Sequence, residues 1–333
     1  MWFFLLEHEH QLQRLRRDLR QTTKRAFAMQ TWSNLRTQIR AYFLFSLFFG
    51  LVALPASLEN ACLYVQFLSR SFKSPQSIRN YLSGLKFMHV LLGFECSFSG
   101  SYVMSLVFRG IDKTLCHVPQ RATPITPDIL VQVARVVRMH DVMDVSSMCA
   151  AMFLFFLMAR AGNIFVRSEH GIVIGLLRRD VVLLDDMLLV TFHRTKVIQF
   201  GRRVLQVPLL PIPGSPLCPV TVYKRMVQLM PANPSDPLFS LGSKGVAVPL
   251  SKQAFLSHFR ALVGRAGGPA PHRFSCPSFR RGGASWAFRI GMPGELIQVY
   301  GDWASECYKL YLDVSMDSKY LFARAIKSSM LLL

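Results

Sequence analysis

Acidic residues are scarce in this sequence, and their scarcity narrows the choice of partners. The 333 residues include only 19 Asp and Glu against 39 Lys and Arg, a formal net charge of +20. A chain this basic is expected to meet an anion, either nucleic acid or an acidic membrane surface. Charged residues make up only 17% and hydrophobic residues 51%. Long disordered tails are therefore not expected, and the chain is long enough for two hydrophobic cores.

Long apolar runs are also missing. The two most apolar stretches are residues 41–56 and 148–159, and both are shorter than the roughly 20 apolar residues of a bilayer-spanning helix. The first ten residues, MWFFLLEHEH, have no basic region and become acidic at Glu7, unlike a signal peptide. We therefore expect buried core helices, no membrane partner and a protein that is not secreted. A basic protein attached to a membrane remains the weaker alternative.

The cysteines lack the spacing of a metal site or of a disulfide framework. There are 7 of them, with no CxxC pair and no Cys–His group at zinc spacing. Reduced thiols in a cytosolic or nuclear protein are the simplest interpretation. Since no nucleotide-binding loop is found either, the sequence predicts no metal and no cofactor.

The first part of the chain has a helical pattern. Residues 1–30 form a basic N-terminal arm on a helix with few apolar positions, either a solvated lead-in or a segment that contacts phosphates. Residues 31–116 contain four short amphipathic helices, one of which starts at Ser74-Pro75 and stops at Gly93. Residues 117–126, HVPQRATPIT, have two prolines and no periodicity, which predicts an interdomain linker.

Residues 127–333 are expected to form a second domain of the α+β class. A helix starts after Thr126, and a buried helix covers 146–160 and ends in Arg160. Strands at 181–184, 187–192 and 204–209 form an antiparallel meander, and helices follow at 219–230, 251–265 and, with interruptions, 277–328. The predicted fold class is mainly α with a small antiparallel sheet.

The residues suited to chemistry are concentrated between 275 and 314. Arg280 and Arg281 lie in the first turns of a predicted helix, and Gly282-Gly283 allow a close backbone approach. Trp303 follows a Gly-Asp turn, and Tyr311 lies eight residues further on. A guanidinium binds two phosphate oxygens at once, and an exposed tyrosine is able to attack phosphorus.

This stretch resembles the C-terminal signature of the tyrosine recombinases, or phage-integrase-like recombinases, with the eukaryotic crypton- and DIRS-type branch most similar. LMARAGNI at 157–164 is similar to the segment with the family's first catalytic arginine, and HRTKVIQFG at 193–201 to its hairpin lysine. SPQSIRNYLSGLKFMH at 74–89 is similar to its helical, SAM-like core-binding domain. The resemblance covers residues 31–325 with the segments in the family's order.

The resemblance implies five catalytic residues. Arg160 and Arg280 would clamp the phosphate, Lys196 would protonate the leaving oxygen, Trp303 would donate a hydrogen bond, and Tyr311 would be the nucleophile. Each has a structural alternative: a helix-end cation for Arg160, an ordinary hairpin residue for Lys196 and a core residue for Trp303. Tyr308 competes with Tyr311. The basic residues expected to contact DNA are Arg79, Lys86, Arg194, Arg202, Arg203 and Arg281.

One position departs from the family pattern. Pro277 stands where the family has the histidine of H-x-x-R, three residues before Arg280. Proline has no side-chain donor or acceptor, although it is well tolerated at the start of a helix. His272, five residues upstream, is the only nearby substitute, and it would need the loop to fold back.

The function implied by the resemblance is recombination or integration of double-stranded DNA through a 3′-phosphotyrosyl intermediate, without metal or ATP. Four protomers on two duplexes would form the active assembly, and the gene would derive from a transposable element. The site of action would be the nucleus in a eukaryote and the cytoplasm otherwise. The alternative is a catalytically impaired DNA-binding protein derived from a mobile element, with Pro277 as the lesion.

Overall fold

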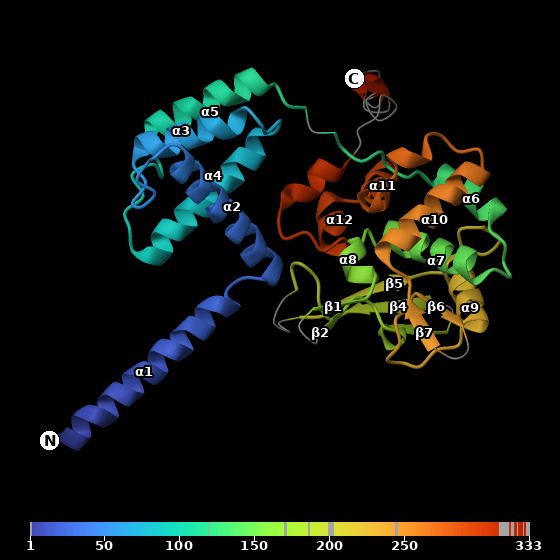
Figure 1. The fold of residues 1–333 in the computed structure, drawn as a ribbon. Helices are drawn as coiled ribbons and strands as arrows, with labels where there is room; N and C mark the ends of the chain where they lie inside the picture. Colours follow the sequence, from blue (N-terminus) through green and yellow to red (C-terminus); the bar gives the residue numbers. More distant parts are fainter. Residues whose placement is uncertain are drawn as a thin grey trace. The chain divides into compact units, whose positions relative to one another are not determined.

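The computed structural model describes residues 2–118, 120–169, 172–185, 187–198, 203–243 and 246–312, with short pieces between 320 and 330. The chain divides into two compact units, Met1–Gln120 and Arg121–Leu333 (Figure 1). The division lies inside the segment 117–126 that the sequence predicts as a linker. Among the described residues, no helix is long and apolar enough to cross a membrane.

The first unit is entirely helical. Helices α2 (Met29–Phe48), α3 (Leu58–Ser69), α4 (Pro75–Leu92) and α5 (Tyr102–Leu115) enclose one core. Tyr42, Tyr64 and Ile78 are fully buried in it. Helix α4 ends at Gly93, whose φ of 75° is the left-handed conformation that glycine adopts without strain. The four predicted helices are therefore present.

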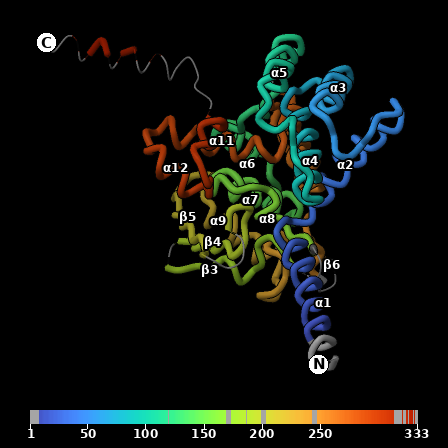
Figure 2. The backbone as a smooth tube through the Cα atoms, turned by 90° about the vertical axis from the view of Figure 1, so that its left-hand side faces the viewer, coloured from blue at the N-terminus to red at the C-terminus, as the bar shows by residue number. Residues whose placement is uncertain are grey.

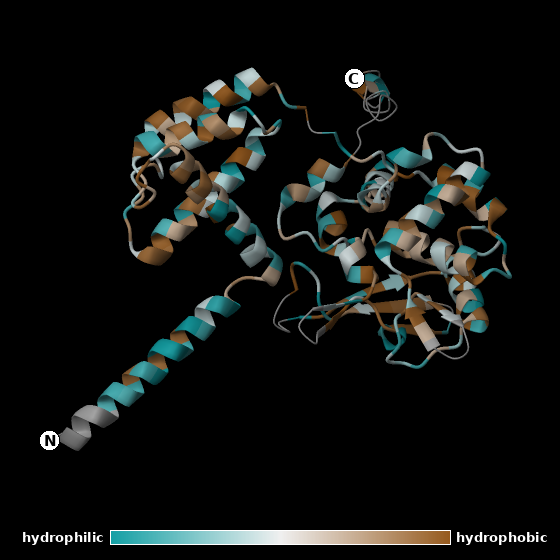
Figure 3. Cartoon of the chain, in the orientation of Figure 1, coloured by the Kyte–Doolittle hydropathy of each residue, from teal (hydrophilic) through white to brown (hydrophobic). Residues whose placement is uncertain are grey.

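Helix α1 (Trp2–Arg25) precedes this core, and its described side chains are almost all exposed. Figure 3 shows the helix as mainly hydrophilic with a few apolar positions. The Trp32 indole nitrogen donates to the Lys24 carbonyl at 2.8 Å, and Phe27 packs edge-on against Trp32 and Phe87. These contacts anchor the C-terminal end of α1, and the helix contributes little to the hydrophobic core.

The second unit combines helices with small antiparallel sheets (Figure 2). Strands β3 (Val181–Leu184), β4 (Met187–Phe192) and β5 (Leu205–Leu209) form a sheet in the order β3-β4-β5. This is the antiparallel meander predicted from the sequence. Two further hairpins were not predicted. They are β1 (Arg167–Glu169) with β2 (Ile172–Ile174), and β6 (Ser240–Ser243) with β7 (Val246–Pro249).

Helix α7 (Val142–Phe156) is the central element of this unit. It contacts α9 (Pro219–Leu229), α10 (Lys252–Arg265) and α11 (Cys276–Arg289), and helix α6 (Pro127–Val136) packs on α10. Because α7 is surrounded, all its residues from 144 to 155 are buried. The apolar stretch 148–159 is therefore part of a core, as the sequence analysis expects.

The prediction that this buried helix continues to Arg160 is wrong. The helix stops at Phe156, and Met158 has a left-handed φ of 47°. The Met158 amide donates to the Phe155 carbonyl at 3.2 Å, and the Ala159 amide donates to the Leu154 carbonyl at 3.2 Å. This is a Schellman ending. Its left-handed residue is a methionine instead of the usual glycine, so the sequence carried no stop signal there.

A buried carboxylate fixes the other end of α7. The Asp144 side chain is fully buried and accepts from Arg138 Nε at 2.9 Å, Arg265 Nη2 at 3.0 Å and His258 Nε2 at 2.8 Å. Burial alone would raise the pKa of Asp144, but the hydrogen bonds from Arg138, Arg265 and His258 outweigh burial and lower this pKa. The cluster ties α7 to α10 and to the segment that follows α6.

Candidate active site

Helix α11 carries the predicted Arg-Arg-Gly-Gly motif, and its two glycines set its position. A Cβ atom on Gly282 would overlap the Ile125 carbonyl oxygen, and one on Gly283 would overlap the Phe155 carbonyl oxygen. Only glycine permits such an approach of a helix to neighbouring backbone. The helix therefore lies directly against the end of α7, which brings Arg280 to Met158. The close approach predicted for this glycine pair is confirmed.

Arg280 is the centre of the site. Its side chain is buried, with 2% of the residue exposed, and Nη1 donates to the Met158 carbonyl oxygen. The guanidinium carbon lies 3.6 Å from the centre of the Trp303 ring and 5.4 Å from that of Tyr311. Nε and Nη2 have no acceptor at full hydrogen-bonding geometry among the described residues, and the Tyr311 side chain is close enough to interact with the guanidinium and raise its pKa. Buried donors without a partner are costly, so this arginine is prepared for a ligand that accepts hydrogen bonds.

A second arginine lies close to the first. Arg160 precedes the short helix α8 (Ala161–Ile164) as its N-cap residue, and its Nη1 is buried with no partner in the described part of the chain. Burial, and after it the positive charge of Arg160, lower the pKa of Arg280 to about 10, against the opposing influence of Tyr311 and Asp302. Two neighbouring cations with unsatisfied donors define an anion site.

Trp303 and two tyrosines complete the cluster. Trp303 is 4% exposed, and its indole nitrogen has no described acceptor. It lies in the turn between helix α12 (Gly294–Tyr300) and the short helix η3 (Glu306–Tyr311), both of which pack on α11. A Cβ on Gly301 would overlap the Trp303 ring. The predicted indole position is therefore fixed by tight packing.

The two tyrosines of η3 differ in exposure. Tyr308 is 7% exposed and belongs to the small core around Trp303. Tyr311 is half-buried, with its ring 5.4 Å from that of Trp303 and facing the Arg280 guanidinium. Ser285 Oγ donates to the Tyr311 carbonyl at 3.2 Å and so links η3 to α11. Of the two tyrosines, Tyr311 is the one that is partly exposed and close to the Arg280 guanidinium.

Lys196 lies in the turn that follows β4, and its residue is exposed. Arg160, Arg280, Trp303 and Tyr311 form one cluster, and Lys196 is joined to it through its neighbour Thr195. The Thr195 hydroxyl donates to the carboxylate of Asp302, which immediately precedes Trp303. Neither Thr195 nor Asp302 was predicted from the sequence. The Gly-Asp turn was visible in the sequence, but the partner of its carboxylate is 107 residues away.

The residues predicted to contact DNA fall into two groups. Arg194 and Lys86 are exposed. Three others make internal contacts: Arg79 pairs with Asp112 at 2.6 Å, Arg203 pairs with Asp302 at 2.7 Å, and Arg281 donates to the Ala122 carbonyl at 3.0 Å. Arg202 lies outside the described residues.

Pro277 is exposed at the second position of α11, one helical turn before Arg280. The capping contact at this end is made by the Ser275 amide, which donates to Ser278 Oγ at 2.9 Å. His272 is also exposed, in the short helix η2 (Pro271–Arg273), and no described contact joins its ring to Arg280. The helix start therefore tolerates proline, and the imidazole position of the family pattern is not filled from His272.

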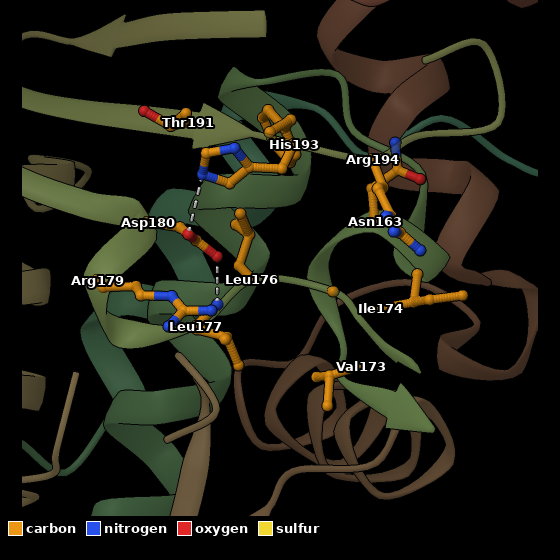
Figure 4. Close-up of a pocket in the computed structure, with 12 residues that line it drawn as sticks. Asn163, Val173, Ile174, Leu176, Leu177, Arg179, Asp180, Thr191, His193 and Arg194 are labelled. Carbon is orange, nitrogen blue, oxygen red and sulfur yellow. Dashed lines mark hydrogen bonds and ion pairs between the residues drawn. The ribbon is translucent and has the colours of Figure 1, made fainter. Parts of the chain in front are cut away.

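A separate cavity of about 300 Å³ lies on the sheet side of the same unit (Figure 4). Asn163, Arg179, Asp180, His193 and Arg194 contribute its polar lining. His193 Nε2 is 3.4 Å from a carboxylate oxygen of the buried Asp180. None of the four clustered side chains lines this cavity. Within the described ranges, no three His, Cys, Asp or Glu side chains are grouped closely enough to hold a metal.

Comparison with known proteins gives a match in structure and none in sequence. No protein-family model matches the chain, and a search of curated proteins finds no match. The Tn1549 transposon integrase in complex with circular intermediate DNA superimposes with a TM-score of 0.61 at 14% identity, over 92% of this chain and 96% of that chain. A lambda integrase dimer bound to a core site gives 0.53 at 14% identity, over 90% and 76%.

XerH site-specific recombinase bound to its difH substrate also gives a TM-score of 0.53, at 13% identity, over 86% of this chain and 76% of that chain. At such low identities the similarity concerns the fold. This chain has the fold of the tyrosine recombinases and integrases, a helical unit followed by an α+β unit. The resemblance inferred from the sequence is confirmed at that level.

Proposed function

We propose that this protein is a DNA recombinase or integrase that breaks and rejoins strands through a covalent bond to Tyr311. One observation carries the proposal. The buried Arg280 guanidinium keeps two donors without a described partner, and it is covered by Trp303 and faces Tyr311. A phosphodiester provides the oxygen acceptors and the negative charge that such a site requires.

The reaction follows from the roles of these groups. Arg280 and Arg160 hold the two non-bridging oxygens and stabilise the charge of the five-coordinate transition state. The Trp303 indole donates to the same phosphate. The Tyr311 oxygen forms a bond to phosphorus as the bond to the 5′-oxygen breaks, and Lys196 gives that oxygen its proton. The Tyr311 proton passes to water, since Pro277 offers no acceptor. A 5′-hydroxyl of the partner strand reverses the step.

Double-stranded DNA is the proposed partner. The net charge of +20 and the exposed Arg194 and Lys86 suit contact with phosphates. The structural neighbours named above are recorded bound to DNA. We assign residues 31–116 to a core-binding domain, 127–333 to a catalytic domain and 1–30 to a basic arm. The active assembly is a tetramer on two duplexes, encoded by a transposable element and acting in the nucleus if the host is a eukaryote and in the cytoplasm otherwise.

A second candidate function is DNA binding without catalysis. The observation that favours it is Pro277, which leaves the proton-transfer position of the family pattern unfilled one turn before Arg280. The rest of the cluster is intact, and a protein that had lost its reaction long ago would not need two neighbouring arginines with buried donors that lack an acceptor. The catalytic proposal therefore explains more of the site.

A suicide substrate tests the proposal. The preferred DNA sequence is first selected from random duplexes, and a nick is then placed so that the cleaved strand's short 5′-hydroxyl fragment diffuses away. We expect a covalent protein–DNA adduct that withstands denaturation and is absent from Tyr311→Phe. Specific binding without an adduct would instead support the second candidate. Tyr308→Phe, which removes the hydroxyl of the buried tyrosine and leaves its ring in place, is the matched control.

A further inference from the structure

We propose that Asp302 is a positioning residue that holds the turn carrying Lys196 against the Trp303 side of the active site. The inference rests on the proposed function, because it assigns Asp302 an effect on the proton that Lys196 delivers. Unlike Trp303, Asp302 does not pack on the Arg280 guanidinium, and its carboxylate has no hydrogen to donate to the phosphate. Its influence passes through the contacts of its carboxylate.

The carboxylate is buried and doubly engaged. Asp302 is 4% exposed and has a left-handed φ of 54°. One oxygen accepts from the Thr195 hydroxyl, and the other accepts from Arg203 Nη2 at 2.7 Å. Burying a charge is unfavourable unless it is paired and hydrogen-bonded. Both partners come from the segment between β4 and β5, about a hundred positions away in the sequence. A contact of this kind joins two parts of the site.

Thr195 organises the turn around Lys196. Its Oγ1 accepts from the Val197 amide at 3.1 Å and from the Ile198 amide at 2.9 Å, and its own amide donates to the Ile198 carbonyl at 3.0 Å. The Thr195 hydroxyl has a single hydrogen, and it donates this hydrogen in its bond to the Asp302 carboxylate. Lys196 is therefore carried by a turn whose central hydrogen-bonding atom is anchored to Asp302.

The other side of Asp302 connects directly to the phosphate cluster. The next residue is Trp303, whose ring covers the Arg280 guanidinium, and the Trp303 amide donates to the Gln298 carbonyl at 3.0 Å. The negative charge of Asp302 also helps to keep Arg280 protonated, because it raises the pKa that burial and Arg160 lower. One side chain thus sets the distance between the lysine turn and the phosphate clamp.

The consequence for the reaction is geometric. A general acid must come within hydrogen-bonding distance of the leaving oxygen, and lysine has a long, flexible side chain whose ordering is unfavourable. When the turn is fixed at Thr195, the Lys196 backbone is already ordered. Less conformational entropy is then lost when the side chain is placed at the leaving oxygen. Without the Asp302 contact, Lys196 is still present but reaches the 5′-oxygen less often.

The test compares two leaving groups. On the selected suicide substrate, the bridging 5′-oxygen at the cleavage position is replaced by sulfur, which departs as a thiolate and needs no general acid. We expect Asp302→Asn and Thr195→Val to slow single-turnover cleavage of the oxygen substrate by roughly 10- to 100-fold, less than the about 10²–10⁴ that a general acid contributes. On the sulfur substrate both variants should cleave within about threefold of the parent protein.

The matched control is Asp185→Asn. Asp185 also has a left-handed φ, of 45°, but it is exposed in the turn after β3, so its change should leave both rates unaltered. An equal loss on both substrates in Asp302→Asn would overturn the proposal, because the residue would then support the whole site. If the parent protein forms no adduct on either substrate, the proposed function fails and this inference with it.

A second measurement does not depend on activity. The Val197 and Ile198 amides should exchange hydrogen at least tenfold faster in Asp302→Asn than in the parent protein, whereas the β3–β4 amides should be unchanged. Unaltered exchange at Val197 and Ile198 would contradict the anchoring role even if cleavage were slower.

Discussion

Replacing Pro277 by histidine is expected to accelerate strand cleavage. Pro277 is exposed one turn before Arg280 on α11, and residues three apart on a helix lie on the same face. The imidazole would therefore project toward the phosphate that Arg280 binds. The neighbouring positive charges of Arg280 and Arg160 would favour its neutral form, which is the form that accepts the Tyr311 proton.

The expected size of the rate increase follows from the usual contribution of general acid–base catalysis. General acid–base assistance is worth about 10²–10⁴ in rate, which corresponds to a barrier lower by roughly 3–5.5 kcal/mol. The stability change should stay within about 1 kcal/mol, since the exposed ring has little packing to lose and only a pre-set φ is removed. An amide at the second position of a helix has no intrahelical acceptor, so restoring it changes little.

The assay measures the rate of adduct formation on the suicide substrate, with Pro277→Ala as the variant that removes the ring without adding an imidazole. Pro277→His should react at least 100-fold faster than Pro277→Ala, a factor at the lower end of the contribution expected from general acid–base catalysis, and the added Tyr311→Phe change should abolish the adduct. If Pro277→His folds, binds DNA and reacts no faster than Pro277→Ala, then Pro277 is not the missing catalytic position.

Three other predictions follow from charge and packing. DNA affinity should fall by roughly 10³ or more between 50 and 200 mM salt if about six phosphates are contacted; a salt-independent affinity in a binding titration would contradict it. Asp144→Asn should lower the free energy of unfolding, measured in urea, by about 1–3 kcal/mol, because the arginines that lose the carboxylate are partly exposed to water. Folding lowers the pKa of Asp144. The Asp144 carboxylate therefore stabilises the folded protein above its unfolded-state pKa of about 3.9, and this stabilisation is lost as pH falls toward the folded-state pKa. Asp144→Asn should lack this loss of stability in acid. Gly283→Ala should cost about 1–3 kcal/mol because its Cβ meets the rigid Phe155 carbonyl; Gly110→Ala in α5, where nothing lies within 4 Å, should instead stabilise, and equal effects would refute the packing argument.

Local signals account for most of the predicted fold. Proline at the first position and glycine after the last predicted the limits of α4, and two short apolar runs separated by an Asp-Asp turn predicted β3 and β4. The end of α7 was missed because Met158 adopts a conformation usually reserved for glycine. The two extra hairpins have strands of only three or four residues, too few for a periodic pattern to emerge.

The site was predictable only where its residues belong to a motif. Arg280, Trp303 and Tyr311 could be named because they recur at fixed spacing within one stretch. The stacking of Trp303 on Arg280 and the anchoring of Thr195 by Asp302 depend on tertiary contacts. No local pattern encodes a contact between residues about a hundred positions apart, so these features emerged only with the structure.

The chemistry of the protein–DNA bond tests the central claim most directly. The adduct from the suicide substrate is digested with protease and nuclease, and mass spectrometry then locates the residue that bears the nucleotide. The account predicts a 3′-phosphate joined to Tyr311, with a free 5′-hydroxyl on the released strand. A nucleotide on Tyr308, a linkage to a 5′-phosphate, or no modified tyrosine on DNA that the protein binds specifically would contradict it.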